Sequence, residues 1–320
     1  MVSSEFEIIE HFFKNATGSN SSVICGIGDD AAIVSSPAGQ QLAISTDTLV
    51  SGVHFLSDTD PYDVGYKSLA VNVSDMAAMA ADPLWVTLSL TLPDSNRDWI
   101  ERFTAGFLEL ATMFNINLIG GDLSQGPLSV TVQIIGTVPD GTALTRSGAK
   151  PGDGIYVTDC LGKAALALAI LKEEIKQFAK IPEPCLARLH RPVPRIETGI
   201  AIRNIASAAI DISDGLISDI QHILNSSSVG AEIELARIPV CPESNDLLDE
   251  MKWKICLGSG DDYELCFTMP DAYADAVTDI EQKSDCSVSR IGTITEGKKL
   301  IWLSVDGKPC TVSHTGYRHF

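Results

Sequence analysis

Hydrophobic and polar positions alternate between two spacings along the chain, one typical of helices and one typical of strands. Apolar residues recur at helical spacing at Ile100, Phe103, Phe107, Leu110 and Phe114, which predicts a helix with an aromatic stripe facing the core. Alternation of apolar and polar residues predicts strands at 85–92 and 128–138. Further helices are expected over 4–14, 62–81, 163–171 and 197–206, and further strands over 42–46, 155–158 and 208–210, with the first of these strands ending at Asp47. The mixture favours an α/β or α+β architecture.

A Gly- and Pro-rich stretch interrupts this pattern near the middle of the chain. Residues 141–154 read GTALTRSGAKPGDG, which is typical of a domain boundary or a major loop. For a chain of 320 residues we therefore expect two domains, 1–147 and 148–320. Asn72-Val-Ser-Asp75 in the first half resembles Asp211-Ile-Ser-Asp214 in the second, but windows this short leave an internal duplication open.

Composition and charge exclude several classes of protein. The chain is 45% hydrophobic, which is too apolar for intrinsic disorder, and its longest apolar run, at 164–171, is too short to cross a bilayer. The net charge of −19 repels nucleic acid and anionic membranes, so neither is an expected partner. Small phosphorylated ligands stay open, provided that metal ions mediate their binding.

The cysteines and the N-terminal residues indicate in which cellular compartment the protein is expected. The eight cysteines show no zinc-ligand spacing, so we expect mostly buried free thiols, with a disulfide framework as the alternative. The start MVSSEFEIIEHFFKN lacks the basic and long apolar regions of a secretory signal. We therefore expect a cytoplasmic protein.

Six groups of carboxylates stand beside glycines or small polar residues near the ends of apolar segments. They include Asp29-Asp30, Asp47, Asp75, Asp122, Asp211 with Asp214, and Asp261-Asp262. Mg²⁺ takes oxygen ligands, commonly one or two carboxylates together with water and substrate phosphates. Several converging groups could hold more than one Mg²⁺ ion. Helix capping is the alternative, above all for Asp75 and Asp214.

Familiar nucleotide-binding and catalytic motifs are missing. Gly162-Lys163 lacks the remainder of a P-loop, Gly26-Ile-Gly28 lacks the third glycine of a dinucleotide fingerprint, and no G-x-S-x-G elbow occurs. Arg146, in the Gly-rich stretch, could bind a phosphate with its guanidinium or could be a solvated loop residue. A nucleotide site in this chain would therefore be an uncommon, metal-rich one.

Read in order, the motifs resemble those of one family along nearly the whole chain. They are Gly28-Asp-Asp30-Ala-Ala, Ser45-Thr-Asp47-Thr, Gly52-Val-His54-Phe, Asn72-Val-Ser-Asp75-Met, Gly120-Gly-Asp122, Leu144-Thr-Arg146-Ser-Gly, Asp211-Ile-Ser213-Asp214-Gly-Leu, Asp262-Tyr-Glu-Leu and Gly316-Tyr-Arg-His-Phe320. This ordered set resembles the thiamine-monophosphate kinase family. Its superfamily also contains aminoimidazole ribonucleotide synthetase, selenophosphate synthetase and a hydrogenase maturation factor.

The resemblance implies an α+β, two-domain synthetase-like fold and a phosphotransferase activity. An N-terminal α/β domain binds ATP and Mg²⁺, and its sheet pairs with a second copy in a homodimer. A C-terminal α/β domain completes the nucleotide and substrate site. The implied reaction is ATP-dependent phosphorylation of thiamine monophosphate to thiamine diphosphate, with several Mg²⁺ ions. The acceptor phosphate is already anionic near neutral pH, so no protein nucleophile is expected and transfer is direct and in line.

The resemblance also implies a role for individual residues. The expected metal ligands are Asp30, Ser45, Thr46, Asp47, Asp75, Asp122, Asp211 and Asp214. The expected nucleotide contacts are Gly121, Asp122, Arg146 and Ser213, and the expected substrate contacts are His54, Asp261 and Tyr317.

Three motifs depart from the usual pattern of the family, at four positions. Ser259 replaces a glycine and Asp261 a glutamate, Leu123 replaces a threonine, and Ala80 replaces a glycine. None of these changes removes an expected metal carboxylate. Two alternatives are another ATP-dependent enzyme of the superfamily and a non-catalytic nucleotide-binding protein. The chain lacks the terminal cysteine of the hydrogenase maturation relative, and Cys25 is poorly placed for a selenophosphate synthetase.

Overall fold

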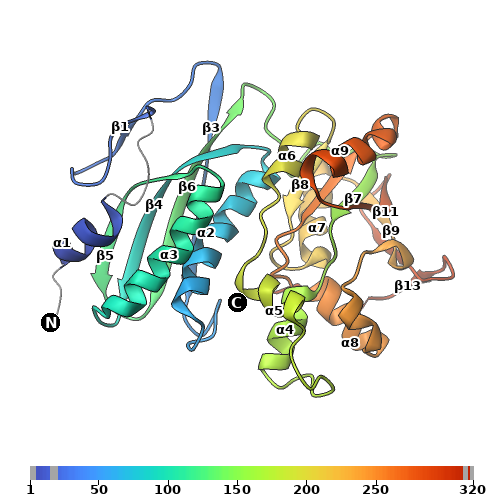
Figure 1. The fold of residues 1–320 in the computed structure, drawn as a ribbon. Coiled ribbons are helices and arrows are strands. Elements are labelled where there is room, and N and C mark those ends of the chain that lie inside the picture. Colours follow the sequence, from blue (N-terminus) through green and yellow to red (C-terminus); the bar gives the residue numbers. More distant parts are fainter. Residues whose placement is uncertain (1–4, 15–20, 313–315, 318–320) are drawn as a thin grey trace. The chain divides into compact units, whose positions relative to one another are not determined.

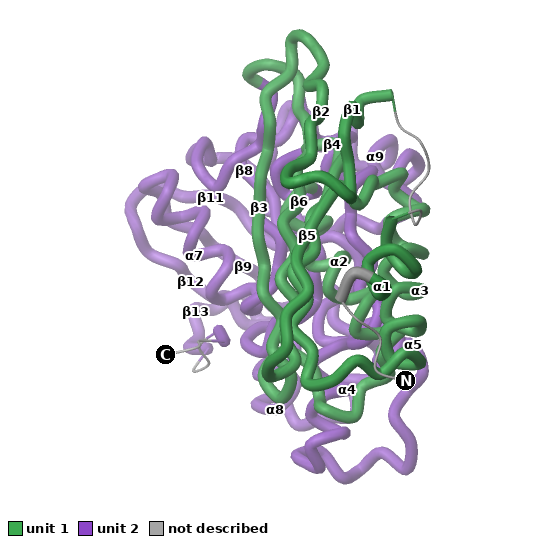
Figure 2. The backbone as a smooth tube through the Cα atoms, turned by 90° about the vertical axis from the view of Figure 1, so that its left-hand side faces the viewer, with its two compact units in different colours: residues 1–76, 81–141 green, residues 77–80, 142–320 purple. Residues whose placement is uncertain are grey.

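The computed structural model describes residues 5–14, 21–312 and 316–317. The chain forms two compact units, one made of Met1–Met76 and Ala81–Gly141 and the other of Ala77–Ala80 and Thr142–Phe320 (Figure 2). In the part of the chain that is described, no helix combines the length and the apolar character needed to cross a membrane.

The first unit is built on a four-stranded sheet with two long helices on one face (Figure 1). The strand order is β3-β6-β4-β5, in which only the β4–β5 pair is parallel. A short antiparallel pair, β1-β2, lies outside this sheet. The elements are α1 (Glu5–Ile8), the π-helical turn η1 (Ile9–Phe13), β1 (Val23–Cys25), β2 (Ile33–Val34), β3 (Gln40–Val50), α2 (Pro61–Ala78), β4 (Asp82–Leu92), α3 (Arg97–Met113), β5 (Asn117–Gln125) and β6 (Ser129–Pro139).

The two long helices of this unit pack closely because glycines face each other's backbones. A Cβ atom on Gly65 of α2 would lie 2.0 Å from the carbonyl oxygen of Phe103, and one on Gly106 of α3 would lie 1.9 Å from that of Tyr62. The predicted apolar stripe of α3 is buried, with Phe103 and Phe107 fully enclosed. Asn96 caps this helix by accepting hydrogen bonds from the backbone N–H groups of residues 98 and 99.

The second unit is built on a seven-stranded sheet of order β13-β12-β9-β11-β7-β10-β8. Only β12 and β9 pair in parallel. The strands are β7 (Gly154–Thr158), β8 (Ala208–Asp211), β9 (Gly230–Glu234), β10 (Leu265–Met269), β11 (Val288–Thr295), β12 (Leu300–Leu303) and β13 (Pro309–Cys310). The helices are α4 (Lys163–Leu171), α5 (Glu183–His190), α6 (Ile196–Ile202), α7 (Leu216–Ser227), α8 (Asp249–Trp253) and α9 (Val277–Ser284), with shorter helical turns η2 (Leu235–Arg237), η3 (Pro242–Asp246), η4 (Lys254–Gly258) and η5 (Asp271–Ala276).

Two apolar clusters hold this unit together. In the larger one, Ile220 and Ile223 of α7 pack on buried strand residues such as Val157 and Ile233. The smaller cluster joins α4, α5 and η4 and contains three buried cysteines, Cys185, Cys241 and Cys256. All eight cysteines are free thiols, five of them buried, which confirms that prediction. They are not all scattered, however, because these three share one cluster.

Most of the predicted elements are present, and the differences have physical reasons. The strand expected to end at Asp47 continues to Val50, because β3 pairs with β6 in unbroken register along its whole length. Asp75 lies near the end of α2 rather than at the start of a helix, so it does not cap one. Asp214 does not cap α7 either, because Gly215 holds that position and makes no side-chain cap bond.

Candidate active site

A pair of carboxylates lies where β3 faces α2. Ser45 and Asp47 alternate with exposed residues along β3, so both side chains lie on the same, less exposed face. Asp75 of α2 accepts a hydrogen bond from Ser45 Oγ, and Asn72 Oδ1 accepts one from the backbone N–H of Asp47 at 3.2 Å. The helix and the strand thus bring together four oxygen-bearing side chains, those of Ser45, Asp47, Asn72 and Asp75, from positions up to 30 residues apart in sequence.

The electrostatics of this pair match an oxygen-ligand cation site. Burial raises the pKa of Asp47 to about 7, with contributions from the negative charge of Asp75 and from a hydrogen bond between the two carboxyl groups. Near neutral pH the Asp47 carboxyl group is therefore only partly ionised, and a divalent cation bound between the two carboxylates would offset their repulsion. Within the described residues, no three His, Cys, Asp or Glu side chains are grouped closely enough to hold a metal ion by themselves. The pair fits Mg²⁺, which commonly takes one or two carboxylates and completes its shell with water and phosphate oxygens.

A cavity of about 790 Å³ in the same unit brings two further expected residues together. Asp30, from the turn after β1, and Asp122, from β5, both line this cavity. Asp29 also lines it, but its side chain accepts a hydrogen bond from the N–H of Asp30 and so fixes the turn. Asp122 accepts a hydrogen bond from Ser124 Oγ at 2.8 Å. Asp30 and Asp122, although 92 residues apart in sequence, therefore border the same cavity.

Gly121 has a structural reason for being glycine. It lines the cavity and has a positive φ of 155°. A Cβ atom there would lie 1.9 Å from the carbonyl oxygen of Leu88, so only glycine lets β5 run against β4 at this point. The backbone of this strand consequently comes to the cavity without a side chain in between.

Two other expected residues of the first unit are placed differently. The side chain of Thr46 lies on the outer face of β3, opposite Ser45 and Asp47, within 3.5 Å of Gln133 Nε2. His54 lies in the turn after β3, where its Nδ1 accepts a hydrogen bond from the N–H of Val50 at 2.9 Å. The strand period separates Thr46 from its two neighbours, and the structure does not bring its side chain to them.

In the second unit, the expected residues of three segments lie next to each other. The N–H of Asp261 donates to the carbonyl of Ser213, and the N–H of Tyr317 donates to the carbonyl of Asp214, at 2.8 and 2.9 Å. Asp211 ends β8 opposite Leu265 at the start of β10. These contacts join the residues expected to bind metal, nucleotide and substrate in this unit. Residues 318–320, the end of the terminal motif, lie outside the described residues.

Asp219 is a residue that the sequence analysis missed. It is buried in α7, and its Oδ2 accepts hydrogen bonds from the N–H groups of both Asp214 and Gly215 at 3.1 Å. Burial raises the pKa of Asp219 to about 7, the charge of Asp214 adds to this, and the guanidinium charge of Arg146 acts in the opposite direction. Asp219 thus fixes the turn that carries Ser213 and Asp214. The only sequence signal was its spacing of five residues after Asp214.

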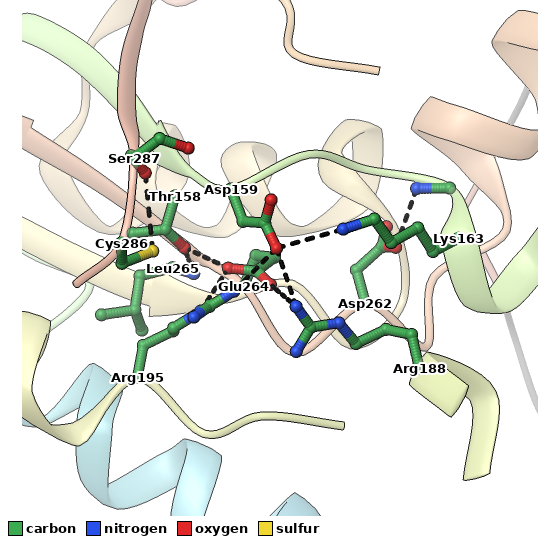
Figure 3. Close-up of polar contacts among 11 residues, drawn as sticks. Thr158, Asp159, Lys163, Arg188, Arg195, Asp262, Glu264, Leu265, Cys286 and Ser287 are labelled. Atoms are coloured by element: carbon green, nitrogen blue, oxygen red, sulfur yellow. Dashed lines mark hydrogen bonds and ion pairs between the residues drawn. The ribbon is translucent and has the colours of Figure 1, made fainter. Parts of the chain in front are cut away.

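A buried ion-pair cluster was also missed. Glu264 accepts two hydrogen bonds from Arg195, both at 2.7 Å, and one from Thr158 Oγ1 at 2.6 Å (Figure 3). Asp159 accepts from Lys163, Arg188 and Arg195 at its Oδ2, and these cations lower its pKa although burial raises it. Arg195 lies just before the helix predicted over 197–206, and no sequence motif marked it as a functional residue.

The class of protein follows from comparison with known families. The model of the N-terminal domain of AIR synthase related proteins matches residues 28–138, and that of the C-terminal domain matches residues 150–302. The chain therefore has the two-domain fold of this class, as the motifs implied.

Comparison with individual proteins identifies the family within this class. The chain is 46% identical to thiamine-monophosphate kinase of Escherichia coli over 322 residues, covering 100% of this chain and 99% of that one. The crystal structure of thiamine-monophosphate kinase from Stenotrophomonas maltophilia superposes with a TM-score of 0.86 at 40% identity, covering 97% and 99% of the two chains. AaThiL complexed with AMPPCP and TMP gives a TM-score of 0.74 at 30% identity, covering 92% of each chain. The chain belongs to the thiamine-monophosphate kinase family, which confirms the resemblance.

Proposed function

We propose that this chain transfers the γ-phosphoryl group of ATP to thiamine monophosphate, forming thiamine diphosphate and ADP. The observation that carries the proposal is the full-length similarity to thiamine-monophosphate kinases, among them AaThiL complexed with AMPPCP and TMP. AMPPCP is an ATP analogue, so that complex holds the two kinds of ligand that the reaction requires. The oxygen-rich groups described above support the same conclusion.

The chemistry needs charge neutralisation and alignment more than proton transfer. The acceptor is a phosphate oxygen that is already anionic near neutral pH, so the main barrier is the approach of two anions in line. Several Mg²⁺ ions, when bound, would neutralise the phosphates and align donor and acceptor. We assign their binding to Asp30, Ser45, Asp47, Asp75, Asp122, Asp211 and Asp214, and the Asp47–Asp75 contact supports this assignment most directly. Thr46 would take part through its backbone carbonyl, because its side chain lies on the opposite face of β3. Transfer is direct, so γ-labelled ATP should leave no label on the denatured protein.

The other contacts are proposed residue by residue. Gly121, Asp122, Arg146 and Ser213 bind the nucleotide, and His54, Asp261 and Tyr317 bind thiamine monophosphate. Arg146 is exposed and presents its guanidinium where it also acts on Asp219, which supports a phosphate contact over a purely solvated role. In this proposal the domain 1–147 carries most of the metal ligands and the dimer contact, and the domain 148–320 supplies the remaining nucleotide and substrate contacts.

We also propose that the chain forms a homodimer through β3. This strand is at the edge of its sheet, and its outer face exposes Leu42 and Ile44 at 49% and 59% of their surface. A second copy would cover this apolar face. Light scattering of the purified protein should give twice 34.2 kDa, and Ile44→Glu should shift the mass toward the monomer. A wild-type protein of monomer mass would contradict the dimer.

A cytoplasmic location is part of the proposal. All eight cysteines are free, including the neighbouring group Cys185, Cys241 and Cys256, and a reducing compartment keeps thiols in that state. Fractionation of the natural host, with detection by an antibody, tests this. Recovery in an oxidising compartment would contradict it.

The decisive experiment is a discontinuous assay with ATP and Mg²⁺ in which thiamine monophosphate, thiamine and an aminoimidazole ribonucleotide precursor are offered in parallel. Thiamine diphosphate should form from the monophosphate alone. Asp47→Asn and Asp122→Asn should abolish it, whereas the exposed Asp58→Asn should not. Product from the aminoimidazole precursor would instead indicate another enzyme of the superfamily. Nucleotide binding without any product would indicate a non-catalytic protein.

A further inference from the structure

The loop that carries Asp261 has an unusual backbone. It joins η4 to β10, and three of its residues, Gly260, Asp261 and Tyr263, have positive φ values of 69°, 64° and 52°. L-residues rarely adopt this region, and each such residue costs free energy unless its surroundings fix it. Two of the three residues here are not glycine. The loop therefore needs contacts that hold it in this shape.

Its residues alternate between the inside and the outside of the unit. Asp262 and Glu264 are almost completely buried, whereas Asp261 and Tyr263 are partly exposed. The buried side is where the side-chain anchors lie. Asp262 Oδ1 accepts a hydrogen bond from the N–H of Gly162 at 2.8 Å, and Glu264 binds Arg195 and Thr158 (Figure 3). The side chain proposed to meet the substrate thus stands next in sequence to an anchored one.

Arg195 makes the strongest of these anchors. Its Nε and Nη2 donate to the two oxygens of Glu264 at 2.7 Å each, in the bidentate geometry that only arginine offers. The side chain is 10% exposed and also donates to Asp159 at 3.0 Å, so its position is fixed on two sides. Arg195 precedes α6, and Glu264 precedes β10, so the pair ties the loop to a separate element of the same unit.

Backbone hydrogen bonds connect the anchored residue Glu264 and the loop up to Asp261 with the segment Ile212–Ser213. The carbonyl of Glu264 accepts from the N–H of Ile212 at 2.7 Å, and the N–H groups of Asp261 and Tyr263 donate to the carbonyls of Ser213 and Ile212 at 2.8 Å. A Cβ atom on Gly260 would lie 2.2 Å from the carbonyl oxygen of Ser213, so the two segments are in direct contact. A shift of Glu264 would therefore displace Asp261 relative to Ser213 and Asp214.

We propose that Arg195 is a positioning residue, which through Glu264 holds the left-handed loop 260–263 and so sets the place of the Asp261 carboxylate for thiamine monophosphate. The inference rests on the proposed function for the role of Asp261 toward substrate. It assigns to Arg195 no contact with either substrate. Substitution of Arg195 is expected to weaken the binding of thiamine monophosphate, which Asp261 is proposed to contact, and to leave the binding of ATP unchanged.

The first test needs no activity. Arg195→Lys keeps the charge but loses the fork, and Arg188→Lys is the matched control, because Arg188 pairs with Asp159 and lies 3.9 Å from Glu264. Hydrogen exchange of a peptide spanning 259–264 should become faster in Arg195→Lys and stay unchanged in Arg188→Lys. Equal exchange in all three proteins would overturn the proposal. Arg195→Met leaves Glu264 buried without its cation and serves as the severe variant wherever it folds.

The second test is a double-mutant cycle. Arg195→Lys should raise KM for thiamine monophosphate by about 10- to 100-fold, the effect of misplacing a binding group by roughly 1 Å, and leave KM for ATP within about twofold. In an Asp261→Asn background the same change should have almost no further effect, because the carboxylate that it positions is gone. Fully additive effects, or an equal rise in KM for ATP, would overturn the positioning role. A wild-type protein that makes no thiamine diphosphate would count against the proposed function, and the exchange experiment would still decide on Arg195.

Discussion

The Asp47–Asp75 pair predicts that the stability of the metal-free protein falls as the pH rises from 5 to 8. The folded pKa of Asp47 is about 7, whereas an aspartate in an unfolded chain has its usual value near 3.8. The folded state therefore binds more protons than the unfolded state between these values, and stability must fall as the pH rises through this window. Above pH 7 the carboxylate is ionised in both states, and the loss is complete.

The magnitude follows from the same two values. At pH 5 the folded carboxyl is about two pH units below its pKa of about 7, which corresponds to about 2.7 kcal/mol of stability that is absent at pH 8. Asp47→Asn replaces the titrating group by a neutral one of similar shape. Between pH 5 and 8, the free energy of unfolding of this variant should fall by about 2.7 kcal/mol less than that of the wild type. At pH 8 the variant should therefore be the more stable protein.

Urea unfolding in EDTA at both pH values measures the difference, with the exposed Asp58→Asn as the control that should follow the wild type. A saturating concentration of Mg²⁺ should then stabilise the wild type at pH 8 more than it stabilises Asp47→Asn, because the variant has lost one of the proposed ligands and a cation stabilises only the state that binds it. The reasoning is refuted if Asp47→Asn has the same pH dependence as the wild type, or if it is the less stable protein at pH 8 without metal.

Three further predictions concern other parts of the chain. Gly260→Ala should lower the free energy of unfolding in urea by about 2 kcal/mol or more, because residue 260 has a positive φ and the added Cβ atom would lie 2.2 Å from the carbonyl oxygen of Ser213. Gly307→Ala is the control: its φ is also positive, but the added Cβ atom would meet open space, so we expect a loss of about 1 kcal/mol. Asn96→Ala should cost about 1 kcal/mol through loss of the α3 cap, and an unchanged urea midpoint would contradict this. A thiol reagent should modify at most three cysteines in the native protein, namely Cys25, Cys160 and Cys310, and all eight after unfolding; rapid modification of a fourth native thiol would contradict the burial of the rest.

Local periodicity was enough to predict much of the secondary structure. The aromatic stripe of α3 and the alternation in β4 and β6 are dictated by short-range spacing, and each element is present near its predicted position. Periodicity did not predict where a strand ends when pairing with a distant strand sets its length. β3 runs past Asp47 because β6 pairs with it as far as Val50, and the partners of residues 48–50 lie 79 to 83 residues away in sequence. Pairing of this kind leaves no local signal.

The candidate site was predicted in its residue types but not in its geometry. The ordered motifs indicated Asp47 and Asp75, and in the structure their carboxyl groups interact directly while Asp75 also accepts a hydrogen bond from Ser45 Oγ. Thr46 shares a motif with them, yet the strand period turns its side chain to the opposite face. Arg195 and Glu264 could not be paired from the sequence, because 69 residues separate them and a bidentate ion pair depends on tertiary packing.

The departures from the family pattern acquire a physical meaning in the structure. Ser259 stands where a glycine is usual, and its φ of −99° is an ordinary conformation for any residue, so the backbone does not require glycine there. Asp261 stands where a glutamate is usual, at a φ of 64°. Asp is one of the few residues that tolerates this region, because its short polar side chain can bond locally. The shorter acid thus suits the backbone of this loop, while its reach toward substrate depends on how well the loop is held.

Two costly features of the described residues lie at or beside residues proposed to bind ligands. The like-charged pair Asp47–Asp75 and the left-handed residues Asp261 and Tyr263 would both relax if their neighbours allowed it. They persist because rigid elements hold them: β3 and α2 fix the first, and the buried Arg195–Glu264 pair fixes the second. Substitutions that relieve either cost should therefore stabilise the ligand-free protein at the expense of catalysis, whereas substitutions that weaken the supporting elements should lower both.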